Sequence, residues 1–149
     1  MNDEATDNDL PVLLLVDDDE VYCSVLANAL QKRGYRVCTA HDLSGALEQA
    51  RSHEPEYAVV DLRIGTESGL ELVKQLAELD ENTRIVMLTG YASVATAVEA
   101  IKLGAESYLT KPLELESVLA IIERALEKVA LSREAADLRR RIDERFQFD

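Results

Sequence analysis

The sequence predicts an α/β protein of the (βα)5 class, a doubly wound parallel sheet covered by helices on both faces. Five short apolar segments, most of them rich in β-branched residues, recur at Val12–Val16, Arg36–Thr39, Tyr57–Val60, Ile85–Leu88 and Ser107–Leu109. Stretches with the apolar period of a helix separate these five segments. Segments such as VLLLV and YAVV are apolar nearly throughout, which is typical of parallel strands buried on both faces.

Between the strands, apolar residues recur three or four positions apart, as they do along one face of a helix. The stripes comprise Val21, Val25, Leu26 and Leu30; Ala46, Leu47 and Ala50; Leu70, Val73, Leu76 and Ala77; Val94, Ala97, Val98 and Ile101; and a fifth that begins at Leu115. Gly34 and Gly104 follow two of the stripes, where a glycine can take a positive φ and end a helix.

The length of the chain fits one compact domain with a tail. It has 149 residues, of which 47% are hydrophobic, and this is enough to bury one core. We predict a flexible acidic N-terminus over residues 1–9, the main domain over residues 10–128, and a helical linker or dimerisation extension over residues 129–149. Cys23 and Cys38 have no second cysteine or histidine at metal-ligand spacing, so neither a zinc site nor a disulfide framework is expected.

Charge and hydropathy exclude two kinds of partner. The formal net charge is −13, whereas binding to duplex DNA depends on Lys and Arg side chains that neutralise phosphates. We therefore expect no direct binding of nucleic acid. No apolar run approaches the roughly 20 residues that span a bilayer, and the acidic start MNDEATDNDL does not resemble a signal peptide. A cytoplasmic protein without membrane contact is expected.

Chemically active residues follow four of the five predicted strands. In an open parallel sheet, ligands bind outside the carboxyl ends of the strands. Asp17, Asp18 and Asp19 follow the first strand, Asp61 the third, Thr89 the fourth and Lys111 the fifth. Clustered carboxylates repel one another, and a hard divalent cation removes that penalty. Mg2+ suits the place, because it takes oxygen ligands and is commonly completed by phosphate oxygens.

The same residues could carry phosphoryl transfer. A carboxylate can attack phosphorus and form an aspartyl phosphate. The reaction needs mainly positioning and neutralisation of the phosphoryl oxygens, which a metal, an ammonium group and a hydroxyl could supply. Asp19 is an exception, because it lies in the turn into the first helix and is expected to cap that helix instead of binding metal.

At these residues the chain resembles the receiver domains of two-component response regulators, from about Leu10 to about Leu126. The motifs are LLLVDDDE, YAVVDLRIGTESGLEL, IVMLTGYAS and GAESYLTKP, in the family's order and spacing. The resemblance implies a flavodoxin-like fold with strand order 2-1-3-4-5. It also implies Asp61 as phosphoacceptor, Asp18 and Asp61 as direct Mg2+ ligands, and Asp17 assisting through water.

Further roles are implied by the same resemblance. The main-chain carbonyl of Arg63 would be another metal ligand, Thr89 the switch hydroxyl and Lys111 the lysine that contacts the phosphoryl group. Tyr108 matches the aromatic residue whose rotamer reports the state, and the Lys111–Pro112 bond is expected to be cis. Gly69 keeps the family's loop length after the phosphoacceptor. Gly65 departs from the pattern, because many members have proline there, and this glycine should loosen the loop.

The resemblance extends to partners and output. VVDLR with GYASVATAVEAIKLGA looks most like RegA-type regulators, and the C-terminal RRRIDERFQFD looks like the linker before an ATPase domain in NtrC-type activators. A sensor histidine kinase is the implied phosphoryl donor, and control of transcription is the implied output. On this interpretation the chain is not an enzyme beyond self-phosphorylation and autodephosphorylation.

Two alternatives stay open. A phosphatase of the haloacid-dehalogenase type would use Asp17 as nucleophile and Asp19 as general acid, because VLLLVDDDEV fits the first motif of that family. Against it, the residues after Lys111 lack the expected acidic pair except at a helix start, and Asp61 would have no role. A receiver-like binding module that never takes phosphate usually lacks one of the acceptor, the acidic pair or the lysine, all of which are present here.

The last predicted helix carries a heptad-like stripe. Its apolar residues are Leu115, Leu119, Ile122, Leu126 and Val129, and the spacing resumes in a shifted register at Leu131, Ala135, Leu138 and Ile142. No glycine or proline interrupts the run from Glu114 to Phe148, so the helix is expected to extend past the body. A homodimer is expected through this helix or through the face formed by the fourth helix, fifth strand and fifth helix.

Overall fold

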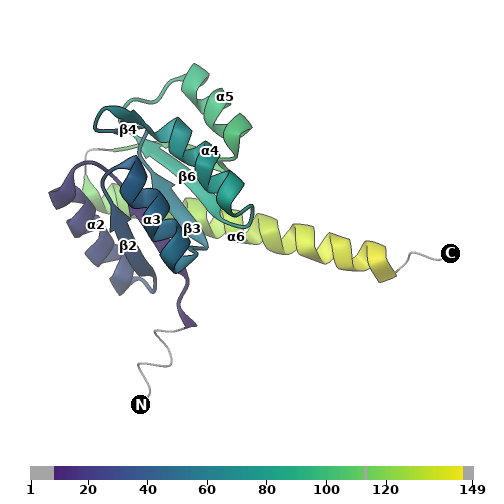
Figure 1. The fold of residues 1–149 in the computed structure, drawn as a ribbon. Coiled ribbons are helices and arrows are strands. Elements are labelled where there is room, and N and C mark those ends of the chain that lie inside the picture. Colours follow the sequence, from purple (N-terminus) through teal and green to yellow (C-terminus); the bar gives the residue numbers. More distant parts are fainter. Residues whose placement is uncertain (1–8, 113, 146–149) are drawn as a thin grey trace, which may run out of the picture.

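The computed structural model describes residues 9–112 and 114–145. A central sheet is formed by β1 (Val12–Val16), β2 (Arg36–Ala40), β3 (Tyr57–Val60), β6 (Arg84–Thr89) and β7 (Ser107–Thr110). The five strands lie in the order β2-β1-β3-β6-β7, and all neighbours are parallel (Figure 1). The predicted fold class and the strand order 2-1-3-4-5 are therefore confirmed.

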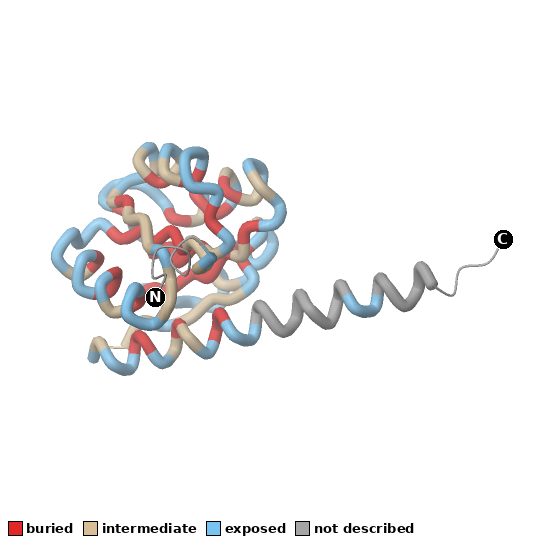
Figure 2. The backbone as a smooth tube through the Cα atoms, turned by 90° about the horizontal axis from the view of Figure 1, so that it is seen from below, coloured by how far each residue is buried: buried red, intermediate tan, exposed pale blue. Residues whose placement is uncertain are grey.

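Helices cover both faces of this sheet. On one side lie α3 (Leu43–His53), α4 (Gly69–Leu79) and α5 (Val94–Leu103), and on the other lie α2 (Glu20–Lys32) and α6 (Leu115–Arg145). The residues of β1 alternate between the two layers, with Leu14 and Val16 in one core cluster and Leu13 and Leu15 in the other. Figure 2 shows the buried residues gathered between the helices. This two-sided burial explains why the strands are apolar nearly throughout.

The apolar stripe of α5 is not its buried face. Val94, Val98 and Ile101 are 82%, 49% and 50% exposed, and Ala100 is the residue of α5 that is buried in the core. Small side chains allow α5 to approach the sheet closely, and Gly104 with φ +126° ends the helix as expected. Val94, Val98 and Ile101 are consequently left on the surface, whereas Leu103 at the end of α5 packs against the core.

A short hairpin follows the third strand, at a position where the sequence predicts only a loop. Its strands are β4 (Arg63–Ile64) and β5 (Glu67–Ser68), which pair antiparallel. Gly65 lies in the turn with φ +65°, a conformation that glycine tolerates and proline cannot adopt. The loop after Asp61 therefore forms a defined turn around Gly65. The absence of a proline at this position had suggested a looser loop.

Helix α6 continues well past the globular body (Figures 1 and 2), as the uninterrupted heptad-like run predicted. Its first part packs on the sheet through Val118, Leu119, Ile122 and Leu126. Arg33, which caps the end of α2, forms an ion pair with Glu123 at 2.5 Å. Leu138 on the extension is 58% exposed. The side chains of Val129, Leu131, Ala135 and Ile142, like residues 1–8 of the predicted acidic segment 1–9, lie outside the described residues.

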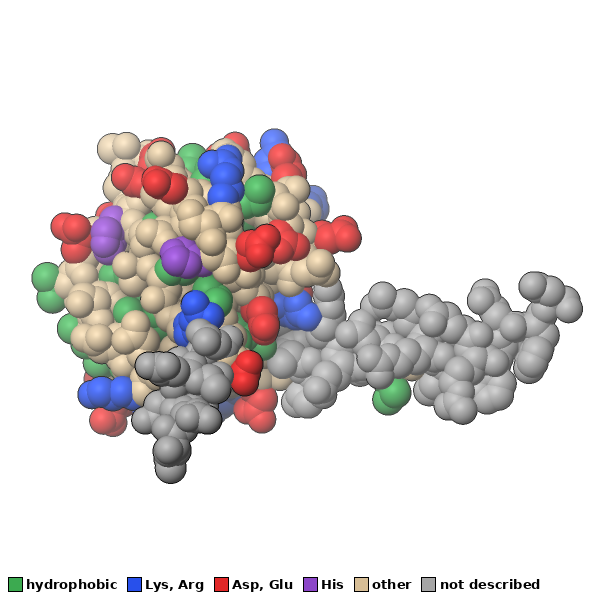
Figure 3. Space-filling model, turned by 60° about the horizontal axis from the view of Figure 1, so that its bottom comes forward, with side chains coloured by type: hydrophobic (Ala, Val, Ile, Leu, Met, Phe, Trp, Pro, Cys, Tyr) green, Lys and Arg blue, Asp and Glu red, His purple; other side chains and the backbone are tan. Residues whose placement is uncertain are grey.

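The surface is charged on many sides. In Figure 3 acidic, basic and histidine side chains are interspersed over the part of the body that is visible. None of the described helices is both long enough and apolar enough to cross a membrane.

Candidate functional site

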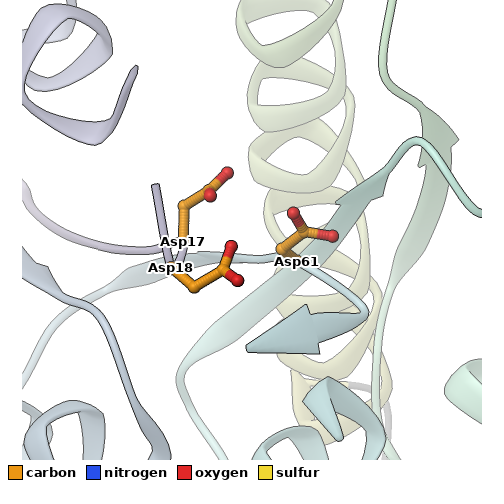
Figure 4. Close-up of side chains that lie close together, drawn as sticks. All are labelled: Asp17, Asp18 and Asp61. Atoms are coloured by element: carbon orange, nitrogen blue, oxygen red, sulfur yellow. The ribbon is translucent and has the colours of Figure 1, made fainter. Parts of the chain in front are cut away.

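Three carboxylates meet at the carboxyl edge of the sheet. Asp17 and Asp18 directly follow β1 and Asp61 directly follows β3, because the parallel neighbours end at the same edge (Figure 4). One oxygen of each lies within 4.8 Å of the others. Asp17 and Asp61 are buried at 5% and 7% exposure, whereas Asp18 is exposed. The cluster is therefore open to solvent on the side of Asp18.

Lys111, which follows β7, joins the two buried carboxylates. Its Nζ donates to Asp17 Oδ2 at 2.8 Å and to Asp61 Oδ2 at 3.0 Å. The second oxygen of Asp17 accepts from the main-chain N–H of Asp19 at 3.0 Å. The second oxygen of Asp61, Oδ1, is buried and has no hydrogen-bond partner among the described residues. Asp61 thus keeps one carboxylate oxygen available for chemistry.

The electrostatics reflect this enclosure. Burial raises the pKa of Asp17, although the hydrogen bond from Lys111 acts in the opposite direction. For Lys111, burial alone would lower the pKa, but the hydrogen bonds to Asp17 and Asp61 outweigh it, and the pKa is raised above its ordinary value. The raised pKa of Asp17 favours the neutral carboxyl, and the raised pKa of Lys111 favours the charged ammonium. The two short hydrogen bonds from Lys111 keep its ammonium charged beside Asp17 and Asp61.

Asp19 does not belong to the cluster. Its side chain caps α2 by accepting from the main-chain N–H of Tyr22 at 3.0 Å. The capping role predicted from sequence is therefore confirmed. This contact argues against the haloacid-dehalogenase alternative, because that mechanism needs Asp19 as general acid, whereas here Asp19 caps α2.

Thr89 and Tyr108 lie on the neighbouring strands β6 and β7. Thr89 is fully buried, and its Oγ1 accepts from the main-chain N–H of Tyr91 at 3.1 Å. Tyr108 is half-buried, and its hydroxyl lies 2.5 Å from Oγ1 of Thr96 on α5. The strand register pairs Met87 with Tyr108. Of the two residues predicted to act as a switch, Tyr108 therefore contacts α5 through Thr96.

The hairpin after Asp61 is tied to the acidic cluster. The main-chain N–H of Gly65 donates to Asp18 Oδ2 at 3.1 Å, a bond that proline could not make. The carboxylate of Glu67 accepts from the main-chain N–H of Leu43 at the start of α3. The guanidinium of Arg63 lies 4.1 Å from the ring centroid of Tyr91. The turn that replaces the usual proline thus positions a member of the acidic cluster.

One expectation from the resemblance is wrong. The Lys111–Pro112 bond is trans, since the described residues contain no cis peptide bond. The trans form is the ordinary preference of an X–Pro bond, by roughly 0.5–1 kcal/mol. Lys111 reaches both carboxylates in this conformation, with its main-chain N–H donating to the Thr89 carbonyl at 2.8 Å.

Several neighbours of the site were not identified from sequence. The ring of Tyr22 lies 4.6 Å from Lys111 Nζ. His41, just after β2, has its Nδ1 3.0 Å from the carbonyl oxygen of Asp17. Thr96 contacts Tyr108 as described above. None of the three has a local motif, because each is brought to the site by a different helix or strand end.

The cluster fits a hard divalent cation. All its side-chain donors are carboxylate oxygens, and such oxygens are the ligands that Mg2+ and Ca2+ prefer. One donor, Asp61 Oδ1, is buried without a protein partner, and another, Asp18, faces solvent. This combination leaves an open side through which an ion with its waters could enter.

Comparison with known proteins agrees with this geometry. The family model for the response regulator receiver domain matches residues 13–123. The chain is 47% identical over 106 residues to the photosynthetic apparatus regulatory protein RegA of Cereibacter sphaeroides, covering 71% of this chain and 58% of that protein. It is 38% identical over 114 residues to the transcriptional regulatory protein ZraR of Escherichia coli, an NtrC-like regulator, covering 76% of this chain and 26% of that protein.

A solved structure is similar as well. A response regulator from Burkholderia pseudomallei, crystallised with a phosphorylated aspartic acid, a calcium ion and citrate, matches with a TM-score of 0.70 and 44% identity. The match covers 85% of this chain and 74% of that one. By contrast, the chain spans under two thirds of the length of RegA.

Both predicted subgroups, RegA-like and NtrC-like, are represented among the relatives. None of these matches supports the phosphatase alternative. The family model matches most of the chain. The strand order of the chain and the position of its acidic cluster agree with what the resemblance implied. The chain belongs to the receiver domains of two-component response regulators.

Proposed function

We propose that Asp61 accepts a phosphoryl group from a sensor histidine kinase, with Mg2+ held in the acidic cluster. The observation that carries the assignment is the state of the Asp61 carboxylate. One oxygen is fixed by Lys111 at 3.0 Å, while the other is buried and has no protein partner among the described residues. A carboxylate held in this way presents one oriented oxygen for attack on phosphorus.

The chain's own residues account for the transfer step. An oxygen of Asp61 forms a bond to phosphorus while the bond from phosphorus to the donor breaks, and the leaving group departs with that electron pair. Lys111 then lies beside the new phosphoryl group and can neutralise part of its charge. Thr89, at the end of the next strand, can donate its hydroxyl to a phosphoryl oxygen.

Four groups would hold the metal. Asp18 and Asp61 are proposed to bind Mg2+ directly, Asp17 through water, and the main-chain carbonyl of Arg63 directly. Asp17 suits an indirect role, because both of its oxygens already accept hydrogen bonds from Asp19 and Lys111. When bound, the ion would offset the repulsion among carboxylates and neutralise charge on phosphoryl oxygens.

Incubation with acetyl phosphate and Mg2+, followed by a Phos-tag gel, tests the proposal. The wild type is expected to give a retarded band that disappears after treatment with acid, because an aspartyl phosphate is acid-labile. Asp61→Asn is expected to give no retarded band. Asn is nearly isosteric but lacks a nucleophilic carboxylate. Asp19→Asn is the matched control, because Asp19 caps α2 nearby and should leave the retarded band intact.

The opposite pattern would overturn the assignment. If Asp61→Asn still gave the band and Asp17→Asn did not, Asp17 would be the nucleophile, as in the phosphatase alternative. If the wild type gave no band with acetyl phosphate or with any phosphorylated kinase, the chain would be a binding module instead.

We further propose that Thr89 and Tyr108 pass the signal to the surface of α5, β7 and α6. On phosphorylation the Thr89 hydroxyl moves toward a phosphoryl oxygen, and Tyr108 fills the space that it leaves. The hydrogen bond between Tyr108 and Thr96 already connects this tyrosine to α5. Val94, Val98 and Ile101 expose an apolar strip on that helix, which suits contact with a second copy of the chain.

A homodimer formed through this surface or through the extension of α6 is the expected readout. Light scattering at tens of micromolar should show a dimer on phosphorylation and a weaker response in Thr89→Ala. If the extension of α6 forms the interface, a chain ended at Val129 should be a monomer, whereas a dimer formed through the surface of α5, β7 and α6 should persist. A phosphorylated wild type that stays monomeric would contradict the dimer. Full dimerisation of phosphorylated Thr89→Ala would contradict the coupling through Thr89.

The output is proposed to be transcription. RegA and ZraR are named as regulatory proteins, and ZraR as a transcriptional one, but the chain spans only part of each. We propose that this chain acts in the cytoplasm, contacts neither membrane nor nucleic acid itself, and signals through the surface described above.

A further inference from the structure

The ring of Tyr22 forms a third side of the site around Lys111. Tyr22 lies in the first turn of α2, three residues after its cap, Asp19. Lys111 Nζ lies 4.6 Å from the centroid of the ring, in addition to 2.8 Å from Asp17 and 3.0 Å from Asp61. The ammonium is thus enclosed by two carboxylates and one aromatic face.

The aromatic contact differs in kind from the two ion pairs. The face of an aromatic ring attracts a cation through its quadrupole, and the attraction is stronger when the cation is partly removed from water. The side chain of Lys111 is 20% exposed, so it is largely desolvated. The oxygens of Asp17 and Asp61 can exchange Lys111 for another partner, whereas the ring holds no competing cation. Its contact with Lys111 does not depend on what the carboxylates bind.

The hydroxyl of Tyr22 does not explain why the residue is there. Tyr22 Oη is buried and has no hydrogen-bond partner among the described residues. Burial raises the pKa of this hydroxyl above its ordinary value, so the ring stays neutral at physiological pH. What the residue offers to the site is accordingly its ring.

We propose that Tyr22 is a positioning residue, whose ring holds the Lys111 ammonium in place while the free oxygen of Asp61 takes a phosphoryl group. The proposal rests on the proposed function, since it assigns a task within the same reaction. Without the ring, Lys111 would be free to swing away once its carboxylate partners change. The expected consequence is slower phosphorylation of an otherwise folded protein.

Three variants separate the ring from the hydroxyl and from general packing. Tyr22→Leu removes the ring, Tyr22→Phe keeps the ring and removes the hydroxyl, and Tyr35→Leu removes an aromatic residue from the same helix layer. The ring of Tyr35 packs edge-on against Tyr57, with centroids 6.1 Å apart. Tyr35→Leu therefore matches the loss of packing without touching the site.

Two measurements apply to each variant. The first is the rate of phosphorylation by acetyl phosphate with saturating Mg2+, which should fall roughly 2- to 30-fold in Tyr22→Leu, the range that corresponds to a cation–π contact. The second is the NMR shift of the Lys111 side-chain methylene next to Nζ, in protein with 13C-labelled lysine and without phosphoryl donor. The ring should shift this signal in wild type and Tyr22→Phe, and the shift should disappear in Tyr22→Leu.

The outcomes distinguish the two proposals. Equal rates and equal Lys111 signals in wild type and Tyr22→Leu would overturn the positioning role while leaving Asp61 as acceptor. A rate in Tyr22→Phe as low as in Tyr22→Leu, or an equal drop in Tyr35→Leu, would also overturn it, because the hydroxyl or the packing would then be responsible. A wild type that accepts no phosphoryl group would refute the proposed function, and the NMR comparison would still test the contact.

Discussion

Gly69→Ala is expected to lower the free energy of unfolding by about 3 kcal/mol, the upper part of the range for overpacking a rigid site. A Cβ on Gly69 would overlap the carbonyl oxygen of Asp61 and come within 2.9 Å of Met87 Cε. The backbone of residue 61 cannot move away easily, because its N–H donates to Val16 in the sheet. Urea unfolding followed by circular dichroism measures the change.

The same substitution should impair the site. To relieve the overlap, either the start of α4 or the main chain at Asp61 must shift, and the Asp61 carboxylate would move with it. Gly90→Ala is the control for stability, because a Cβ there has open space and Gly90 has no positive φ. That variant should stay within roughly 0.5 kcal/mol of wild type. If Gly69→Ala were equally stable, the close approach of the two main chains would be refuted.

Lys111→Met is expected to reduce phosphorylation at least about 100-fold, in line with the loss of one group that stabilises charge in the transition state. It should also lower stability at pH 8 by roughly 2–3 kcal/mol. This is less than the roughly 3–5 kcal/mol for breaking a fully buried ion pair, because the side chain of Lys111 is 20% exposed. The substitution leaves Asp17 and Asp61 buried without a cation.

The loss of stability should depend on pH. In wild type the raised pKa of Lys111 means that its contribution to stability is present throughout the range below its ordinary pKa of 10.5 and is lost only above it. In the variant, the pKa of Asp17, already raised by burial, loses the opposing hydrogen bond. A raised carboxyl pKa costs stability above that pKa, and the cost disappears as the pH falls toward the ordinary value of 3.8.

Urea unfolding in EDTA at pH 5 and pH 8 measures this difference. The deficit of Lys111→Met relative to wild type should be larger at pH 8, and Mg2+ should restore part of it by binding the folded state. The control is Lys74→Met, which removes an exposed lysine of α4 and should have a small effect at both values. Equal deficits at pH 5 and pH 8 would show that packing, and not charge, is lost.

Much of the site could be predicted from the sequence, because its residues stand at the carboxyl ends of the strands. Asp17, Asp61 and Lys111 each stand directly after a strand, Thr89 is the last residue of its strand, and parallel strands end at a common edge. Predicting that these residues converge therefore required only the positions of the five apolar segments and of the helices that connect them. The capping role of Asp19 was equally local, since it depends on the first turn of one helix.

Other features could not be derived from local pattern. The stripe of Val94, Val98 and Ile101 has the period of a buried face but is exposed, because α5 approaches the sheet through small residues. The Lys111–Pro112 bond is trans although the resemblance implied cis. The exposure of the stripe depends on how two surfaces meet, which periodicity along one segment does not specify, whereas the trans bond is the ordinary preference of an X–Pro bond.

By itself, the sequence determined the (βα)5 sheet and the meeting of the carboxylates with the lysine, because these depend on periodicity and on which residues stand at the end of each strand. The strand order was implied by the resemblance to receiver domains. The tertiary structure alone decided the contacts between segments distant in sequence: the Gly65 N–H on Asp18, the Tyr22 ring on Lys111, and the overlap that reserves position 69 for glycine. The physical reason is that such contacts depend on ångström-scale distances between separately packed elements, whereas sequence patterns specify only the face or the edge on which a residue lies.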